Sequence, residues 1–148
     1  HTRLQGDWSS DVCSSDLAMD LREPKYLGLN GATTHLYNVG AFFRASSYLA
    51  VCEGEIDTIT LSYNCDIPAV GVPGVNNWKK HYYKLLMDFD KVFVFADGDQ
   101  AGGDFAKSLA RELNNVIIVH MPEGEDVNSM YLKSGKNYFL EKIASSDY

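Results

Sequence analysis

Carboxylate side chains gather in three short segments of the sequence, and each segment contains glycine. They are Glu53-Gly54-Glu55-Ile56-Asp57, Asp97-Gly98-Asp99 and Glu123-Gly124-Glu125-Asp126, and each follows closely on an apolar run. Carboxylates that crowd together repel one another and resist joint ionisation unless a cation lies between them. Oxygen ligands without cysteine or histidine suit Mg²⁺ or Mn²⁺ better than zinc. These residues therefore favour phosphoryl or nucleotidyl transfer assisted by a metal ion.

The spacing of Asp97 and Asp99 favours the same chemistry. Side chains at i and i+2 of an extended chain leave the same face, so this pair can present two carboxylates to one or two ions. An acid that follows a strand can instead cap the next helix and stabilise its dipole. Asp57 and Asp104 are open to this plainer interpretation. Glu53, Asp97 and Asp99 together favour a site, because all three converge with glycines.

Four continuous apolar runs predict buried β-strands, at residues 48–52, 67–72, 92–96 and 116–119. Apolar residues at helical spacing lie between and after these runs. The expected helix faces are Ile56, Ile59 and Tyr63; Trp78, Tyr82, Leu85, Leu86 and Phe89; Phe105, Leu109 and Leu113; and residues 127–132 and 138–144.

This alternation of strands and helices predicts an α/β fold, with a mostly parallel sheet of about four strands flanked by helices. Ligand sites in such sheets lie beyond the carboxyl ends of the strands. The three acidic segments are therefore expected to meet at one edge of the sheet.

The first part of the chain gives weaker signals. Asn30-Gly31 lies between two short apolar stretches and predicts a small N-terminal β-hairpin. Residues 7–17 (DWSSDVCSSDL) resemble the translation of a common sequencing adapter, and the alternative is a polar, disordered terminus rich in Ser and Asp. With either interpretation, residues 1–17 are an artefactual or disordered tail that does not enter the fold.

Composition excludes several classes of protein. The 148 residues suit one domain of about 100–150 residues, and 45% hydrophobic residues argue against intrinsic disorder. A net charge of −7 disfavours nucleic-acid binding through a large basic surface, whereas a local basic patch or bound metal ions stay compatible with it. No apolar run reaches the roughly 18–20 residues of a membrane span, and no signal peptide opens the chain. The three cysteines show no CxxC spacing, as expected of reduced thiols in a cytosolic protein.

Two of the acidic segments resemble the TOPRIM domain, which DnaG-type and phage primases share with topoisomerases, OLD-type nucleases and recombination proteins. The resemblance rests on VCEGEID at residues 51–57 and VFVFADGDQAG at residues 92–102. Val-Pro-Gly at residues 72–74, Asp-Val-Asn at residues 126–128, and KYLGLNG and LYNV within residues 25–39 are similar to primases, notably those of phages. The resemblance covers residues 25–140. It implies a TOPRIM-like (Rossmann-like) catalytic domain at residues 48–148, preceded at residues 18–47 by the end of another primase subdomain.

The resemblance also implies roles for individual residues. Glu53 matches the carboxylate that acts as acid or base or organises the metal. Asp97, Asp99 and Asp126 match positions that bind Mg²⁺ or Mn²⁺ together with it. Asp57 and Asn128 match a second acidic set, in which the neutral side chain of Asn128 is a weak candidate for a metal ligand.

Three further residues have two interpretations each. Lys25 and Arg44 are candidates to contact template or nucleotide phosphate, since Lys offers a point charge and Arg a bidentate donor. The alternative for both is solvated surface charge. Trp78 could stack on a base, but its apolar partners at helical spacing favour a place in the core.

The resemblance as a whole implies the catalytic core of a DNA primase, a nucleotidyltransferase that uses Mg²⁺ to make short RNA primers from nucleoside triphosphates on single-stranded DNA. It implies a replicative helicase as partner, fused or separate, and no membrane, in the cytoplasm of a bacterium or a phage-infected cell. The alternatives are an OLD-type TOPRIM nuclease and a non-catalytic TOPRIM module of a recombination or helicase protein. Primases also carry an amino-terminal zinc-binding module, which this sequence lacks. We therefore expect this chain to be a fragment of a primase, and the sequence does not decide whether the fragment is active by itself.

Overall fold

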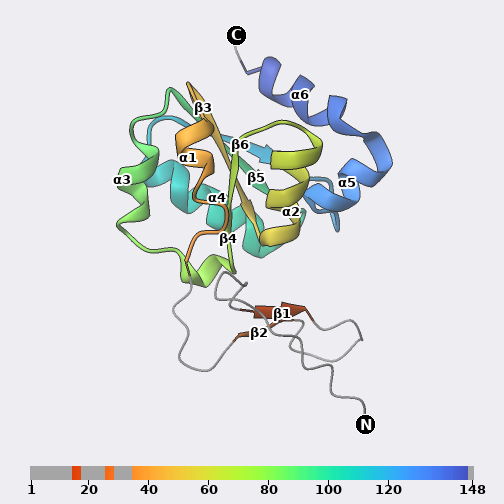
Figure 1. Ribbon diagram of the computed structural model, residues 1–148, viewed down its shortest axis with the longest axis horizontal. Helices are drawn as coiled ribbons and strands as arrows, with labels where there is room; N and C mark the ends of the chain where they lie inside the picture. The colour runs from red at the N-terminus through yellow and green to blue at the C-terminus, as the bar shows by residue number, and fades with distance from the viewer. Residues whose placement is uncertain (1–14, 18–25, 29–34, 147–148) are drawn as a thin grey trace. The chain divides into compact units, whose positions relative to one another are not determined.

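The computed structural model describes residues 15–17, 26–28 and 35–146, and the chain divides into two compact units, residues 1–34 and 35–148. In the first unit, β1 (Ser15–Leu17) pairs antiparallel with β2 (Tyr26–Gly28) (Figure 1). The hairpin turn predicted at Asn30-Gly31 lies outside the described residues. The predicted site residues from Arg44 onward all belong to the second unit.

A four-stranded parallel sheet forms the centre of the second unit. Its strand order is β4-β3-β5-β6, and each neighbouring pair is parallel. The strands are β3 (Tyr48–Glu53), β4 (Ala69–Val72), β5 (Lys91–Ala96) and β6 (Val116–His120). Each predicted apolar run forms a strand, so the predicted α/β fold with a parallel sheet is confirmed. Because all four strands run the same way, their carboxyl ends share one edge of the sheet.

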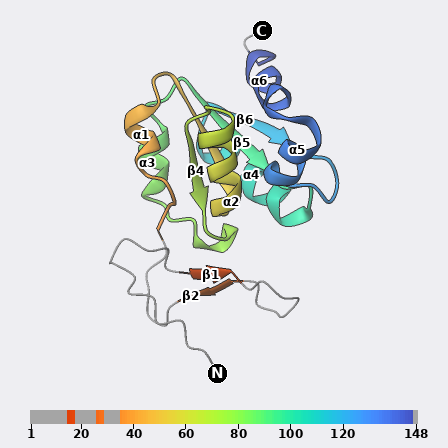
Figure 2. The same cartoon turned by 45° about the vertical axis from the view of Figure 1, so that its right-hand side comes forward.

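Helices cover both faces of this sheet (Figure 2). The first face carries α1 (Ala41–Arg44), α3 (Tyr82–Leu86) and α4 (Gln100–Glu112), which share a buried core with Val51 and Val94 of the central strands. Successive strand residues point to opposite faces, so the neighbours of these valines belong to the other core.

The second face carries α2 (Glu55–Ile59), its π-helical continuation η1 (Thr60–Asn64), α5 (Val127–Ser134) and α6 (Lys136–Ala144). Phe93, Phe95 and Phe139 are fully buried in this core, and the rings of Phe95 and Phe139 lie 5.8 Å apart. Burial of each such side chain contributes about 1.5–3 kcal/mol. This packing fixes the helices that follow β3 and β6 against the sheet.

The helix predicted after β3 forms, but its predicted apolar face is wrong. Ile56, Ile59 and Tyr63 are 44%, 36% and 63% exposed, whereas Asp57, Thr58 and Leu61 face inward. The polar residues can be buried because their hydrogen bonds are made inside the fold: the Thr58 hydroxyl donates to the carbonyl of Gly54 at 2.7 Å, and Asp57 bonds to α5.

The helix predicted over residues 78–89 is also shorter than expected. Only Tyr82–Leu86 is helical, after a 3₁₀ turn at Val75–Asn77 (η2), and Leu85 is 46% exposed. At the end of the helix, the side-chain amide of Asn115 donates to the carbonyls of Leu86 and Phe89 at 2.9 and 2.7 Å, and so satisfies carbonyl groups that the helix leaves without partners. Trp78 lies before the helix, is partly buried against the first core, and packs edge-on against Tyr82, Tyr83 and Phe105, which favours the interpretation as a packing residue.

Residues 35–47, which we expected at the end of a preceding subdomain, pack with the sheet in this structure. Leu36 and Ala41 are buried in the first core, and Tyr37 exchanges backbone hydrogen bonds with Gly71 of β4 at 2.8 and 3.1 Å. Within the described part of the chain, no helix is both long enough and apolar enough to cross a membrane.

Candidate metal-binding and catalytic site

Glu53 is the last residue of β3, and its carboxyl group turns inward at the carboxyl edge of the sheet. Oε1 of Glu53 is buried and accepts no hydrogen bond from the described residues. A Cβ atom on residue 102 would lie only 2.7 Å from this oxygen, so the absence of a side chain at Gly102 leaves room for it. Burial raises the pKa of Glu53 from 4.5 to about 7, the charges of Asp97 and Asp99 add to this rise, and the backbone amide of Asp97 partly opposes it. The structure thus brings Glu53 together with Asp97 and Asp99.

Asp99 has a structural role that the sequence analysis assigned to other acids. Its Oδ1 accepts the backbone N–H of Gly102 at 2.8 Å and caps the N-terminus of α4. Asp104, which we considered as a cap, lies one turn inside α4, and both of its carboxylate oxygens accept from the side chain of Gln100 at 2.9 Å. The cap uses one carboxylate oxygen of Asp99, and the second takes no part in it.

Two backbone hydrogen bonds join the acidic loops that follow β5 and β6. Gly98 donates its N–H to the carbonyl of Glu125 at 2.8 Å, and Gly124 donates to the carbonyl of Gly98 at 3.0 Å. The loops can approach this closely only because residue 98 is glycine: a Cβ atom there would lie 1.8 Å from the carbonyl oxygen of Pro122. Gly98 therefore fixes the loop of Asp97 and Asp99 against the loop of Asp126.

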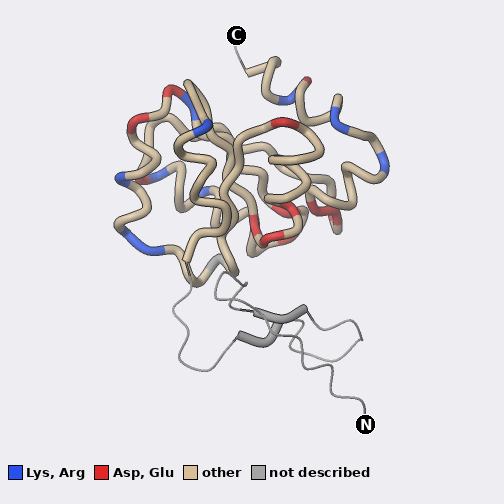
Figure 3. Tube along the Cα trace, viewed as in Figure 1, with Lys and Arg blue, Asp and Glu red and all other residues tan. Residues whose placement is uncertain are grey.

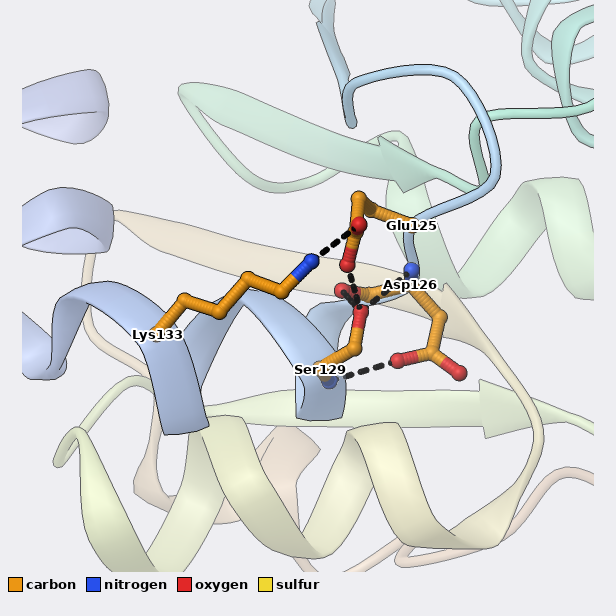
Figure 4. A network of polar contacts seen from close by, with 4 residues as sticks. All are labelled: Glu125, Asp126, Ser129 and Lys133. Atoms are coloured by element: carbon orange, nitrogen blue, oxygen red, sulfur yellow. Dashed lines mark hydrogen bonds and ion pairs between the residues drawn. The ribbon is translucent and has the colours of Figure 1, made fainter.

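Asp126 caps α5 through a reciprocal pair of hydrogen bonds. Its Oδ1 accepts the N–H of Ser129 at 2.7 Å, and the hydroxyl of Ser129 lies 3.0 Å from the backbone N of Asp126, whose N–H it accepts (Figure 4). Glu125 accepts from the same hydroxyl at 2.6 Å and forms an ion pair with Lys133, and these contacts lower its pKa. Figure 4 shows the Asp126 carboxylate on the far side of Ser129 from Lys133. Lys133 therefore pairs with Glu125 and leaves the charge of Asp126 uncompensated within this network.

Asp57 is not a cap of its own helix. It is 7% exposed, and its Oδ1 accepts the backbone N–H of Asn128 in α5 at 2.9 Å. Burial raises its pKa from 3.8 to about 7, the Asn128 hydrogen bond lowers it, and the charges of Asp126, Asp97 and Glu53 add to the rise. The predicted second acidic set of Asp57 and Asn128 is thus a bonded pair beside the other carboxylates.

Of the two predicted phosphate contacts, only Arg44 can be placed relative to this group. Lys25 lies outside the described residues. Arg44 donates to Oδ1 of Asn38 at 3.2 Å and lies over the ring of Tyr63 at 5.9 Å. Asn38 in turn donates to the carbonyl of Ala69, the first residue of β4. Arg44 is therefore at the amino end of the strands, opposite the edge that carries Glu53.

The carboxylates fit a hard divalent cation, although they are not preassembled around one. Figure 3 shows a group of Asp and Glu residues at the lower edge of the second unit. Among residues 15–17, 26–28 and 35–146, no three Asp, Glu, His or Cys side chains lie close enough together to form a ready-made metal site. Mg²⁺ commonly binds through one or two carboxylates and completes its shell with water and substrate phosphates. The buried Oε1 of Glu53, which lacks a hydrogen-bond partner in the described chain, is an atom that such a cation would satisfy.

Sequence reasoning did not identify Gly98 and Gly102 as individual site residues. The signal was present in Asp-Gly-Asp and Ala-Gly, since glycine permits close approach of the backbone. The structure shows which atoms approach: a loop carbonyl at Gly98, and the Glu53 carboxyl together with the backbone of Asp97 at Gly102.

The parallel sheet carries Glu53 at the end of one central strand and Asp97 and Asp99 after the other, which is the arrangement that the resemblance to TOPRIM domains implies. Residues 50–131 match the family model described as Toprim-like, and the chain belongs to this family. Within this family, the chain is similar to DNA primases.

Two relatives illustrate the range of similarity in sequence. The chain is 47% identical over 125 residues to the Gene 57 protein of Mycobacterium phage D29, and the aligned segment covers 84% of this chain and 82% of that protein. The chain is 34% identical over 104 residues to the DNA primase of Buchnera aphidicola, and the aligned segment covers 65% of this chain but 18% of that primase. The chain thus spans most of the phage protein and a small part of the bacterial one.

Solved structures share the fold. A DNA primase domain from Pseudomonas aeruginosa superposes with a TM-score of 0.66 at 26% identity, covering 88% of this chain and 45% of that one. The primase fragment of the bacteriophage T7 primase-helicase protein gives a TM-score of 0.64 at 24% identity, covering 80% of this chain and 52% of that one. This chain therefore corresponds to about half of each solved fragment.

Proposed function

We propose that this chain is the metal-binding catalytic domain of a DNA primase that joins nucleoside triphosphates into short RNA primers on single-stranded DNA. The primases among its relatives support this choice among the activities of TOPRIM domains. The single structural observation that supports catalysis is the environment of Glu53. A carboxyl group buried beside two other carboxylates, with a pKa of about 7, is suited to proton transfer near neutral pH.

Mg²⁺ or Mn²⁺ would be held by Glu53, Asp97 and Asp99, with Asp126 contributing from the neighbouring loop. A bound ion would supply charge neutralisation for the triphosphate and a lower pKa for an attacking 3′-hydroxyl. Asp99 and Asp126 each use Oδ1 to cap a helix, so the caps fix both side chains and leave the second oxygen out of the cap bond. Carboxylates fixed in this way need little further ordering when a ligand arrives.

Glu53 would take the proton of the attacking hydroxyl. The pKa of Glu53 is about 7 in the metal-free protein, and a cation bound nearby would lower it, so the ionised form, which is the base, would prevail at neutral pH. Gly102 leaves room for this carboxyl against the first turn of α4. The side chain is therefore held at the edge of the sheet, where a substrate would approach.

The partners of this site would be a single-stranded DNA template and nucleoside triphosphates, in the cytoplasm of a bacterium or a phage-infected cell. The T7 primase-helicase protein among the structural relatives supports a replicative helicase as a further partner, fused or separate. Lys25 stays a proposed phosphate contact. Arg44, at the opposite end of the strands, would contact template away from the carboxylates.

Primer synthesis by a Glu53→Gln variant tests this proposal. Glutamine keeps the shape of the side chain but cannot take the proton, so the initial rate of RNA primer formation on single-stranded DNA should fall by at least ~10²-fold. The assay uses the intact natural polypeptide that carries this domain. Asp104→Asn is the matched control, because Asp104 is exposed on α4 and bonds only within its own helix.

Thermal melts of both variants accompany the assay. Near-normal synthesis by Glu53→Gln, with its fold intact, would refute the catalytic role of Glu53. Cleavage of single-stranded DNA by the parent without primer synthesis would instead favour a TOPRIM nuclease.

A further inference from the structure

Asp57 caps a helix to which it does not belong. It lies in the first turn of α2 and faces inward, yet its Oδ1 accepts the N–H of Asn128, 71 residues further along the chain. Asn128 is the second residue of α5, and its N–H is one of the donors that a helix cannot satisfy internally. The next N–H, of Ser129, is satisfied by Asp126. Two carboxylates from different elements thus share the N-terminus of α5.

A second contact strengthens the same junction. Thr60, which is 2% exposed, donates its hydroxyl to Oδ1 of Asn128 at 3.2 Å, a bond that it shares with the carbonyl of Ile56 at 3.0 Å. The backbone and the side chain of Asn128 are therefore both bound from the α2–η1 segment. We refer to Asp57, Thr60 and Asn128 as the α2–α5 latch.

The latch acts on the loop that carries Asp126. On one side, this loop is joined to the Asp97–Asp99 loop by the two backbone hydrogen bonds of Gly98. On the other side, the latch ties Asn128, two residues after Asp126, to α2. Since α2 begins two residues after Glu53, the latch connects the elements that carry Glu53 and Asp126.

We propose that Asp57 is a positioning residue, which holds the N-terminus of α5 against α2 and thereby sets the place of Asp126 at the metal-binding edge. The inference rests on the proposed function, because that function assigns Asp126 to the metal. A residue that positions through a hydrogen bond needs an acceptor oxygen, whereas a direct metal ligand of this kind needs its negative charge. Asparagine keeps the acceptor and loses the charge, and alanine loses both.

Three variants of the whole chain separate these roles: Asp57→Ala, Asp57→Asn and the control Asp104→Ala, an acid whose hydrogen bonds stay within α4. The first measurement is Mn²⁺ affinity by calorimetry. The second is hydrogen exchange of the Asn128 amide by NMR, which reports the hydrogen bond directly. We expect Asp57→Ala to weaken Mn²⁺ binding by about tenfold or more and to speed exchange at Asn128. Asp57→Asn should keep the affinity within about threefold of the parent, and the control should leave both quantities unchanged.

Two results would overturn the inference. If Asp57→Asn loses as much affinity for Mn²⁺ as Asp57→Ala does, Asp57 is a direct metal ligand. If Asp57→Ala keeps the parent's affinity for Mn²⁺, Asp57 has no positioning role. If Asp57→Ala does not fold, Asp57→Asn still decides, because a tenfold loss at an unchanged melting temperature contradicts positioning. A parent chain that binds no Mn²⁺ refutes the proposed function itself, and this shows before any variant is compared.

Discussion

Replacing Glu53 by Gln should stabilise the metal-free protein at alkaline pH and leave its stability unchanged at acidic pH. Folding raises the pKa of Glu53 from 4.5 to about 7, because the carboxyl is buried beside Asp97 and Asp99. Between these two values the folded state binds more protons than the unfolded state, so the free energy of unfolding falls as pH rises from 4.5 to 7. Below pH 4.5 the carboxyl group is protonated in both states. Above pH 7 it is ionised in both, and the folded state then bears the full free-energy cost of a buried charge beside two other carboxylates. Glutamine has the same shape and never ionises, so it escapes this cost.

The size of the effect follows from the shift. A rise from 4.5 to about 7 is a difference of about 2.5, and each pKa unit corresponds to about 1.4 kcal/mol, which gives an upper value of about 3.4 kcal/mol. Glu53 is half-buried, so solvent screening reduces this to about 1–2 kcal/mol. For a domain of this size, the melting temperature of Glu53→Gln should exceed that of the parent by about 3–6 °C at pH 8.

Thermal melts of the parent and of Glu53→Gln from pH 4 to pH 8, with EDTA present, measure this difference. The control is Glu125→Gln, since Glu125 is paired with Lys133 and its pKa is lowered, so its removal should give no gain at pH 8. An unchanged difference between parent and Glu53→Gln across the pH range would refute the assignment of a buried, destabilised carboxyl at this position.

The remaining predictions concern packing. Gly98→Ala places a methyl group 1.8 Å from a backbone carbonyl oxygen of the neighbouring loop. Loss of the two backbone hydrogen bonds there should cost about 1–3 kcal/mol and lower the melting temperature, whereas Gly103→Ala, with nothing within 4 Å, should not. Leu61→Ala should cost about 2–5 kcal/mol by denaturant unfolding, because Leu61 is fully buried. Tyr63→Ser should change stability little, since Tyr63 is 63% exposed. A larger loss of stability for Tyr63→Ser than for Leu61→Ala would instead support the helix face first predicted from the sequence.

The sheet and the place of the site could be predicted from the sequence because their signals are local. The runs that form β3 and β5 are apolar at every buried position, as expected of strands covered on both faces. Parallel strands then bring their carboxyl ends to one edge whatever the details of the helices. Glu53 and Asp97 could therefore be placed together before any distance was known.

The orientation of α2 and the bonds of its acids depend on contacts that no local pattern records. Asp57 is buried because its acceptor oxygen meets an N–H from α5, and the pairing spans 71 residues. Ile56 and Ile59 have helical spacing, but spacing does not say which stripe of a helix faces the sheet. Arg44 was predicted to contact template or nucleotide phosphate because of its bidentate donors, and the structure places it at the opposite end of the strands from the carboxylates.

The capping roles of Asp99 and Asp126 illustrate a different limit. Both residues follow strands, and this position serves helix capping and ligand binding equally well. In this chain one oxygen of each carboxylate is used in a cap. The capping role therefore does not argue against a metal-binding role. Metal-binding experiments decide whether a capping carboxylate also binds a cation.

Binding of Mn²⁺ to the parent chain and to Asp97→Asn combined with Asp99→Asn tests the central claim most directly. Both substitutions remove charge, and Asn at position 99 still caps α4 about as well as Asp, so the fold should be retained. We predict that Mn²⁺ broadens the amide signals of Glu53, Asp97, Asp99 and Asp126 in the parent before others, and that the double variant loses this binding. Unchanged Mn²⁺ binding by the double variant, or broadening centred away from the carboxyl edge of the sheet, would contradict the account.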